Sequence, residues 1–258
     1  QALKSGNNNL SSSLNLNYRH KGLDVFRGMT FQNDYLAGSR SLLEQTTFGT
    51  DVTHTQTGFT QSDEKFSRIH YNAGVNWQLD DDNFVGVKLE RGKWLKNNLI
   101  FTMEVDILRN GVKEDYLKSV SDFAYKNPNT LQANAYYNGK IGKWGFDANV
   151  DYYSQCDKND DHINEQAMSG TRTVESTTEN KSHLFAARLI ADHPLWTGKL
   201  SIGGELTTVC RDNNYRISGV ENISDRLSKV SEQNYAAFFE YGIMIPKAGM
   251  LTLGMRYE

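Results

Sequence analysis

Oxygen-bearing side chains alternate along one stretch of the sequence in the manner of a calcium-binding loop. Asp157, Asn159 and Asp161 occupy the first, third and fifth positions of such a loop. His162 stands where the loop requires glycine, and Met168 stands where it requires glutamate. The pattern therefore favours a solvated polar loop over a calcium site.

The other acids and the histidines form no catalytic pattern. Asp80, Asp81 and Asp82 are consecutive, which fits a tight turn better than a metal site because Asp tolerates turn conformations. No two of the six histidines lie four residues apart with a Glu between them. Neither a Gly-x-Ser-x-Gly motif nor a phosphate-binding loop occurs. We expect no enzyme activity, no metal and no cofactor.

Three aromatic residues in a predicted loop are the candidate ligand-binding residues. Tyr116, Phe123 and Tyr125 could stack on a sugar ring, since aromatic side chains offer large rigid surfaces. They could equally pack the loop against itself, and we favour this second interpretation. No other substrate-binding residue is predicted.

Composition narrows the class of protein. The 258 residues carry a formal charge of -3, so nothing indicates a nucleic-acid partner. No stretch approaches 18 consecutive apolar residues, which excludes a predicted transmembrane helix. Mean hydropathy is -0.61, but the alternating strands of a membrane barrel can also give a low value. Thirteen tyrosines and twelve phenylalanines with only three prolines favour strands.

Apolar and polar residues alternate in ten segments, which predicts ten strands in five hairpins. The predicted strands cover approximately 9–20, 23–37, 68–79, 85–90, 131–138, 144–152, 185–192, 199–208, 235–245 and 251–257. The first hairpin turns at Lys21-Gly22. We therefore expect an all-β chain, an antiparallel up-and-down meander of about ten strands forming a single, incomplete domain over 1–258.

Connection lengths point to a membrane barrel. Connections inside the hairpins have about two to five residues, whereas those between hairpins are long and polar. The long ones are 38–65, 95–129, 157–181 and 213–231. Transmembrane barrels have short periplasmic turns and long extracellular loops. The first long connection can instead extend its two strands, and weak helical spacing in "DYLKSVSDFAY" and "ISDRLSKV" allows short helices.

Aromatic residues lie near both ends of the predicted strands. Trp77, Trp144 and Trp196 lie near short turns, while Trp94, Tyr152 and Tyr235 lie toward the other ends. Two such belts are expected where a barrel crosses the membrane interfaces, although aromatics are common in any strand.

One charge interrupts the predicted apolar face. A lipid-facing Arg costs about 2–4 kcal/mol at mid-membrane and less near the edges. Arg27 either reaches toward the interface, or a bulge at Gly28 turns it inward. The apolar stretches of the other strands carry no comparable charge. Acidic and basic residues on the opposite face fit a wet barrel interior.

The two cysteines are expected to be free thiols. Cys156 and Cys210 fall on predicted strands separated by one other strand. Strands two apart lie roughly 9–10 Å from each other, which exceeds the range for a disulfide of about 4.4–6.8 Å between Cα atoms.

Three short stretches resemble a known family. "LNLNYRHKGLDVF", "ADHPL" and the closing "LGMRYE" are similar to sequences in TonB-dependent receptors of the bacterial outer membrane. That family commonly has a Gly-Leu-Arg-Tyr-Glu-like strand end, which here reads Gly254 to Glu258. The resemblance implies a 22-stranded barrel with an amino-terminal plug, driven by an energy-coupling protein of the inner membrane.

We therefore expect a segment of an outer-membrane TonB-dependent receptor that takes up a nutrient or chelate. Its partners would be outer-membrane lipid, the plug, the energy-coupling protein and a small-molecule or oligosaccharide ligand. The plug and the remaining strands would lie outside this piece, and barrel closure and oligomeric state stay open. The alternative is a soluble or surface-exposed all-β ligand-binding module, which needs a second sheet over the apolar face. An outer-membrane barrel enzyme would need a polar catalytic cluster that the sequence does not show.

Overall fold

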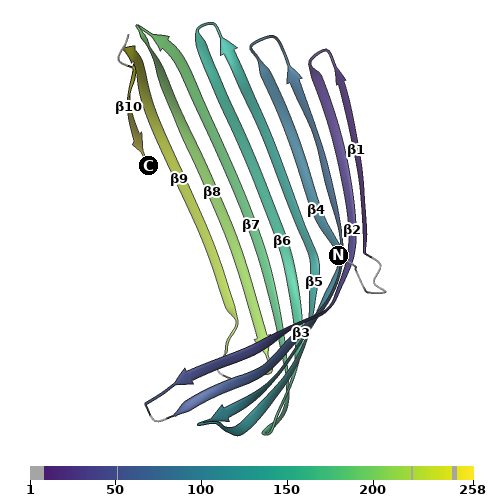
Figure 1. Cartoon of the computed structure of the whole chain (residues 1–258). Helices are drawn as coiled ribbons and strands as arrows, with labels where there is room; N and C mark the ends of the chain where they lie inside the picture. Colours follow the sequence, from purple (N-terminus) through teal and green to yellow (C-terminus); the bar gives the residue numbers. More distant parts are fainter. Residues whose placement is uncertain (1–8, 51, 222, 246–248) are drawn as a thin grey trace.

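The computed structural model describes residues 9–50, 52–221, 223–245 and 249–258, and these form one ten-stranded sheet (Figure 1). Strand order follows chain order, and neighbouring strands are antiparallel. The predicted all-β meander is confirmed. The strands are β1 Leu10–His20, β2 Leu23–Phe48, β3 Thr53–Gln78, β4 Phe84–Arg109, β5 Val112–Ile141, β6 Trp144–Ala167, β7 Gly170–Leu195, β8 Gly198–Ser218, β9 Arg226–Ile245 and β10 Gly249–Tyr257.

The strands are far longer than predicted. β2, β3, β4 and β7 each have 26 residues, which at about 3.3 Å per residue is roughly 85 Å. A transmembrane strand needs only about 9–11 residues. Most of 38–65, 95–129, 157–181 and 213–231 therefore continues the strands. The alternative that 38–65 extends its two strands is confirmed, whereas the prediction of long loops over the other three segments was wrong. No predicted short helix forms, and none of the described residues belongs to a helix that could cross a bilayer.

Tight turns close the hairpins at both ends. Lys21 and Gly22 have φ values of 44° and 79°, which confirms the predicted turn. Asn110 and Gly111, with φ values of 50° and 80°, make the turn between β4 and β5. Both central residues of a type I′ turn need positive φ, which Asn-Gly adopts readily. This Asn-Gly pair lies inside a segment that we predicted as a loop.

One-residue irregularities interrupt three of the long strands. The register shifts between Leu36 and Ser39 of β2, between β3 and β4 opposite Ser67/Arg68, and between Lys126 and Asn129 of β5. A further shift, at Ile107/Leu108, lies beside the turn between β4 and β5. An extra residue reverses which side chains face each side of a sheet, because the side-chain period is two. Beyond the first three of these points, the odd-numbered and even-numbered residues of β2, β4 and β5 therefore exchange faces of the sheet.

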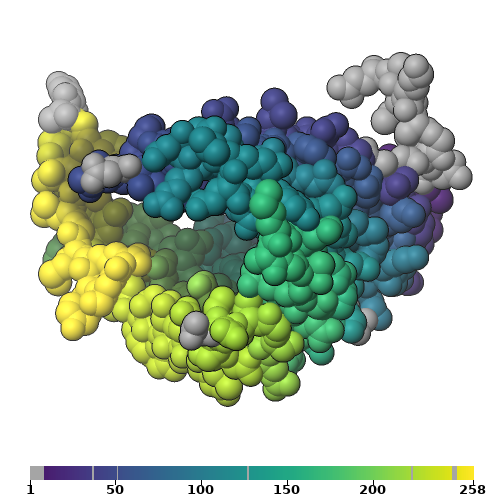
Figure 2. Space-filling view, turned by 90° about the horizontal axis from the view of Figure 1, so that it is seen from below, coloured from purple at the N-terminus to yellow at the C-terminus, as the bar shows by residue number. Residues whose placement is uncertain are grey.

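The sheet is curved, with a concave and a convex side. Figure 2 shows a hollow between the first strands and the last ones. The concave side is called the inner face below. The buried side chains of the described residues all lie on it, and they are Asn97, Val105, Ser119, Asp157 and Val174. The convex side is called the outer face.

No described part of the chain covers the apolar outer face. Val75, Leu189 and Phe239 remain 39%, 51% and 43% exposed, and Val105 and Val174 are the only buried apolar side chains among the described residues. The accessible surface is 17856 Å², against about 11,500 Å² for a compact protein of this mass. The described residues therefore form no packed core over the apolar face.

Aromatic rings on the inner face lie directly over glycines of the next strand. A Cβ added to Gly203 would lie 2.3 Å from Phe238 Cζ, and one added to Gly74 would lie 2.3 Å from Phe26 Cζ. The rings fill the space that a side chain would need, so glycine is required at these positions for packing. Gly204, on the outer face, has no atom closer than 3.5 Å to an added Cβ.

Both cysteines are free thiols, as predicted. Cys156 of β6 and Cys210 of β8 are separated by β7, where they pair with Lys181 and His183.

The packing of Phe238 on Gly203 predicts a difference between two adjacent glycines. Gly203→Val should destabilise the sheet by about 1–3 kcal/mol, because the new side chain displaces the ring. Gly204→Val should change stability by no more than about 0.5 kcal/mol. Urea unfolding of the intact protein in detergent, followed by tryptophan fluorescence, measures both. Equal effects of the two substitutions would contradict the packing described here.

Candidate functional site

Four aromatic side chains form a continuous strip on the inner face. Phe66 of β3 lies 5.3 Å from Trp94 of β4, centroid to centroid, and Trp94 lies 6.2 Å from Tyr125 of β5 in a stacked arrangement. Tyr125 meets Phe123 edge to face at 4.7 Å. We call Phe66, Trp94, Phe123 and Tyr125 the aromatic strip. It crosses three strands just beyond the apolar band.

The structure separates the three predicted ligand-binding residues. Tyr116, Phe123 and Tyr125 lie on β5 and not in a loop, so that part of the prediction was wrong. The register shift between Lys126 and Asn129 places Phe123 and Tyr125 on the inner face. Tyr116 has the opposite parity and lies outside the strip. Phe66 and Trp94, which sequence reasoning did not select, complete it.

Trp94 was predicted to belong to an interfacial belt, and this was wrong. It lies opposite Arg68 on the inner face and belongs to the aromatic strip. The tryptophans near the short turns do lie on the exposed outer side, and Trp77 and Trp196 are largely uncovered. Exposed tryptophans are therefore found at the short-turn end.

A polar pocket adjoins the strip. It has a volume of about 420 Å³ and is lined by Gln32, Arg68, His70, Trp94 and Thr130, among others. The Arg68 guanidinium lies 5.8 Å from the Phe66 ring centroid and 6.0 Å from that of Trp94. Arg68 Nε also donates to Gln32 Oε1 at 2.8 Å, which fixes the guanidinium beside the rings.

Two hydrogen-bond acceptors beside the strip have no partner among the described residues. Asn97 is 6% exposed, and its Nδ2 donates to Glu64 at 3.4 Å while its Oδ1 receives nothing. Asn159 Oδ1 is also buried and unpaired. Asn97 pairs with Phe66 and Asn159 pairs with Tyr125, so each acceptor neighbours a ring. A buried acceptor without a partner is costly, and a ligand donor could satisfy it.

Carboxylates surround the far side of the strip. Asp157 is 8% exposed and accepts hydrogen bonds from Gln155 Nε2 at 3.2 Å and Asn180 Nδ2 at 2.9 Å. Asp161 accepts from Ser121 Oγ. Burial raises the pKa of Tyr125, and the nearby charges of Glu64 and Asp157 raise it further. The phenol therefore stays protonated and able to donate at neutral pH.

The calcium-like segment is a strand and not the solvated loop that we predicted. Asp157, Asn159 and Asp161 alternate along β6, so all three face inward. Within the part of the chain that the structure describes, no three His, Cys, Asp or Glu residues are grouped to hold a metal ion. The three residues instead line the approach to the aromatic strip.

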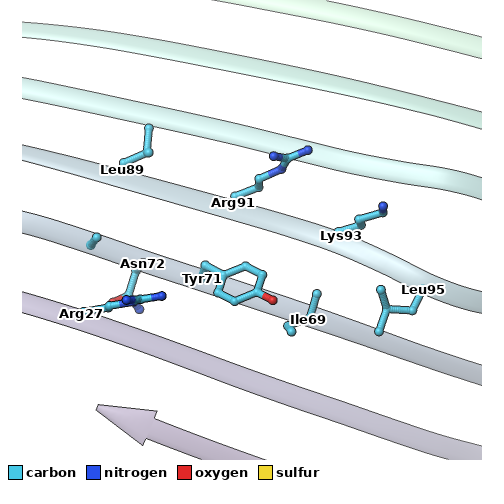
Figure 3. A pocket seen from close by; sticks show the side chains of 9 residues that line it. Arg27, Ile69, Tyr71, Asn72, Leu89, Arg91, Lys93 and Leu95 are labelled. Atoms are coloured by element: carbon cyan, nitrogen blue, oxygen red, sulfur yellow. The ribbon is translucent and has the colours of Figure 1, made fainter. Parts of the chain in front are cut away.

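The outer face carries a second pocket, lined by three cations. Arg27 of β2, Arg91 and Lys93 of β4 surround a hollow of about 850 Å³ together with Ile69, Tyr71, Leu89 and Leu95 (Figure 3). We call this the cation pocket. The register of β2 is continuous through Gly28, so no bulge turns Arg27 inward. Arg91 and Lys93 also correct the prediction that the other strands carry no comparable charge.

Comparisons with known proteins do not identify a family. No family model matches the sequence, and no curated protein matches it. Among solved structures, the siderophore receptor PiuA from Acinetobacter baumannii is 10% identical with a TM-score of 0.34, covering 96% of this chain and 47% of that one. The ferric citrate transporter FecA in its unliganded form is 10% identical with a TM-score of 0.38, covering 98% and 42%. This chain spans less than half the length of either protein.

The edge-to-face contact in the strip predicts a measurable coupling. A double-mutant cycle with Phe123→Ala and Tyr125→Ala should give a coupling energy of about 0.5–1.5 kcal/mol, as aromatic pairs do. The control cycle combines Phe123→Ala with Tyr116→Ala, whose side chains face opposite sides, and should give a value near zero. Both coupling energies are calculated from the unfolding free energies of the intact protein and its variants. Similar coupling in the two cycles would show that the strip is not formed as described.

Proposed function

We propose that this chain is part of the wall of an outer-membrane receptor that takes up a nutrient through a β-barrel. The outer face is the side that meets lipid, and the inner face lines the passage. The chain acts by binding and transport and not by catalysis. The aromatic strip lies beyond the apolar band, where it meets a ligand before the ligand enters the membrane region.

One observation carries this proposal: an apolar face that the chain leaves uncovered, opposite a polar face that curves inward. Leu14, Val87 and Leu253 are exposed on the outer face of strands at both edges and near the centre of the sheet. Arg188 and Asp147, on the inner face, form an ion pair at 3.5 Å. Exposed apolar area of this extent needs an apolar partner, and a bilayer supplies one along the whole row.

Two further features support a barrel wall. All backbone pairing in the sheet is antiparallel between consecutive strands, which is the arrangement of outer-membrane barrels. The short-turn end carries exposed tryptophans at the level expected for a membrane interface. A soluble binding module would need a second layer over the outer face, and the described residues form only one sheet.

The family-level proposal is a TonB-dependent receptor, on the strength of the sequence stretches that resemble one. It brings with it a location in the bacterial outer membrane, a plug inside the barrel and an energy-coupling partner in the inner membrane. These partners would act on parts of the protein other than the sheet described here.

Adjacent residues of β6 test the assignment of the two faces. After Cys156 and Cys210 are replaced by Ser, Val150→Cys and Asp151→Cys are each spin-labelled in the intact protein reconstituted into vesicles. The label at position 150 should be accessible to oxygen dissolved in the lipid, and the label at position 151 to a water-soluble nickel complex. Equal water accessibility at both positions would reject the membrane wall and favour the soluble module.

The chemistry of the strip also predicts the kind of ligand. Rings stack on the apolar faces of sugars, the free oxygens of Asn97 and Asn159 accept hydrogen bonds, and Glu64, Asp157 and Asp161 disfavour anions. A neutral ligand rich in hydroxyl groups fits this set better than an anionic chelate.

Maltoheptaose and ferric citrate are suitable probes for this prediction. Maltoheptaose should quench the fluorescence of Trp94, and Tyr125→Ala should weaken its binding about tenfold, or about 1.4 kcal/mol. Tyr116→Ala is the matched control and should change the affinity less than twofold. The fluorescence change on adding maltoheptaose should disappear in Trp94→Phe, which shows that it comes from Trp94. Tighter binding of ferric citrate than of the oligosaccharide would contradict the neutral-ligand prediction.

A further inference from the structure

The cation pocket is an unusual feature of the apolar band of the outer face. Cross-strand neighbours of Arg27 are Leu16 and Ala73, those of Arg91 are Tyr71 and Leu131, and those of Lys93 are Ile69 and Asn129. None of these neighbours is acidic. Three positive charges thus stand among apolar and neutral groups on the side proposed to meet lipid.

The three cations have no carboxylate partner among the described residues. Arg91 Nε donates to Asn129 Oδ1 at 3.3 Å, which is a neutral contact, and Arg27 and Lys93 form no ion pair. By contrast, Lys118 and Lys126 on the outer face of β5 pair with Glu104 and Asp160. The charges of the pocket are therefore left for something outside the chain to neutralise.

The position and direction of the side chains indicate where that partner lies. Lys93 is the tenth residue of β4, where a span of about 9–11 residues reaches the second interface. Figure 3 shows Arg91 and Lys93 extending along the sheet toward Leu95, away from the short turns. Long basic side chains near the end of a span reach for the polar headgroup level in this way.

We propose that the cation pocket binds the headgroup of a membrane lipid that carries at least two phosphate groups. Arg27, Arg91 and Lys93 contact the phosphates, and the acyl chains run from there toward the short turns along Leu89. A lipid with one phosphate would leave two of the three charges unpaired, whereas a lipid with two or more phosphates matches them. Guanidinium groups suit phosphate because they donate hydrogen bonds in pairs. This inference rests on the proposed function, since only a wall within a bilayer meets lipid on this face.

Lipid selectivity of the intact protein tests this proposal. The protein is placed in phosphatidylcholine nanodiscs that contain either cardiolipin, with two phosphates, or phosphatidylglycerol, with one, and bound lipid is counted by native mass spectrometry. We expect cardiolipin to be retained at least tenfold better than phosphatidylglycerol. Inorganic phosphate at millimolar concentration should not displace it. Equal retention of the two lipids, or displacement by free phosphate, would overturn the proposal.

Matched variants locate the site. Combining Arg27→Gln, Arg91→Gln and Lys93→Gln should lower cardiolipin retention at least tenfold. The control combines Lys118→Gln, Lys126→Gln and Lys158→Gln, which removes the same charge from the outer face elsewhere, and should change retention less than twofold. If the pocket variant does not insert, Lys93→Gln alone should still lower retention severalfold. Unchanged retention in the pocket variants would place the lipid elsewhere and overturn the proposal.

The proposed function can fail separately from this inference. Spin labels at positions 150 and 151 report whether the sheet lies in the bilayer, independently of which lipid surrounds it. A sheet in the bilayer without selectivity for two-phosphate lipid would overturn the lipid site alone. A sheet that does not enter the bilayer would overturn both.

Discussion

The structure depends on one constraint: every backbone amide in these long strands must find its partner in a neighbouring strand, while the two sides of the same strand face different surroundings. The continuous antiparallel pairing from β1 to β10 meets the first requirement within the sheet. The alternation of side chains meets the second. In the proposed bilayer setting no water can replace a missing backbone hydrogen bond, so the proposed wall requires a closed ring of strands.

Curvature then decides what each side can do. On the concave side, neighbouring side chains converge, which is why Asn97, Ser119 and Asp157 are buried although no second layer covers them. Rings over glycines, such as Phe238 over Gly203, accommodate this crowding. On the convex side the same side chains diverge and stay open. Binding groups thus gather on the inner face, and the outer face retains the open apolar area and the cation pocket.

The sequence was sufficient for the fold class and for the strands next to the short turns, because alternation there is clean in segments such as Val85, Val87 and Leu89. It was not sufficient for the far halves of the strands. In β4 the apolar residues Phe101, Met103 and Val105 also occupy odd positions, but the irregularity at Leu95 turns them to the inner face, whereas Val85, Val87 and Leu89 face outward. The odd positions Arg91, Lys93 and Asn97 between the two halves are polar, so the apolar alternation is interrupted there and the remainder was taken for a loop. In β6 no bulge intervenes, and the far half was missed because Ser154 to Gln166 carries almost no apolar residue.

The candidate site was found only in part for the same reason. Phe123 and Tyr125 could be selected as exposed aromatics, but their pairing with Phe66 and Trp94 depends on register across three strands. The Asn110-Gly111 pair was the available signal: it fixes a hairpin, and the hairpin brings β4 and β5 into alignment. The cation pocket also needed register, because Arg27 and Lys93 are 66 positions apart in the sequence.

The bulges in β2, β4 and β5 have a consequence for how such a protein can change over evolutionary time. At each bulge the odd-numbered and even-numbered residues exchange faces. The pattern of inward and outward residues next to the short turns is therefore independent of the pattern in the far halves of the strands. One-residue insertions in the far halves of the strands can be absorbed at these points without turning the apolar side chains next to the short turns toward the inner face. The halves next to the short turns can thereby stay constant for the proposed bilayer contact while the far halves change to suit a different ligand.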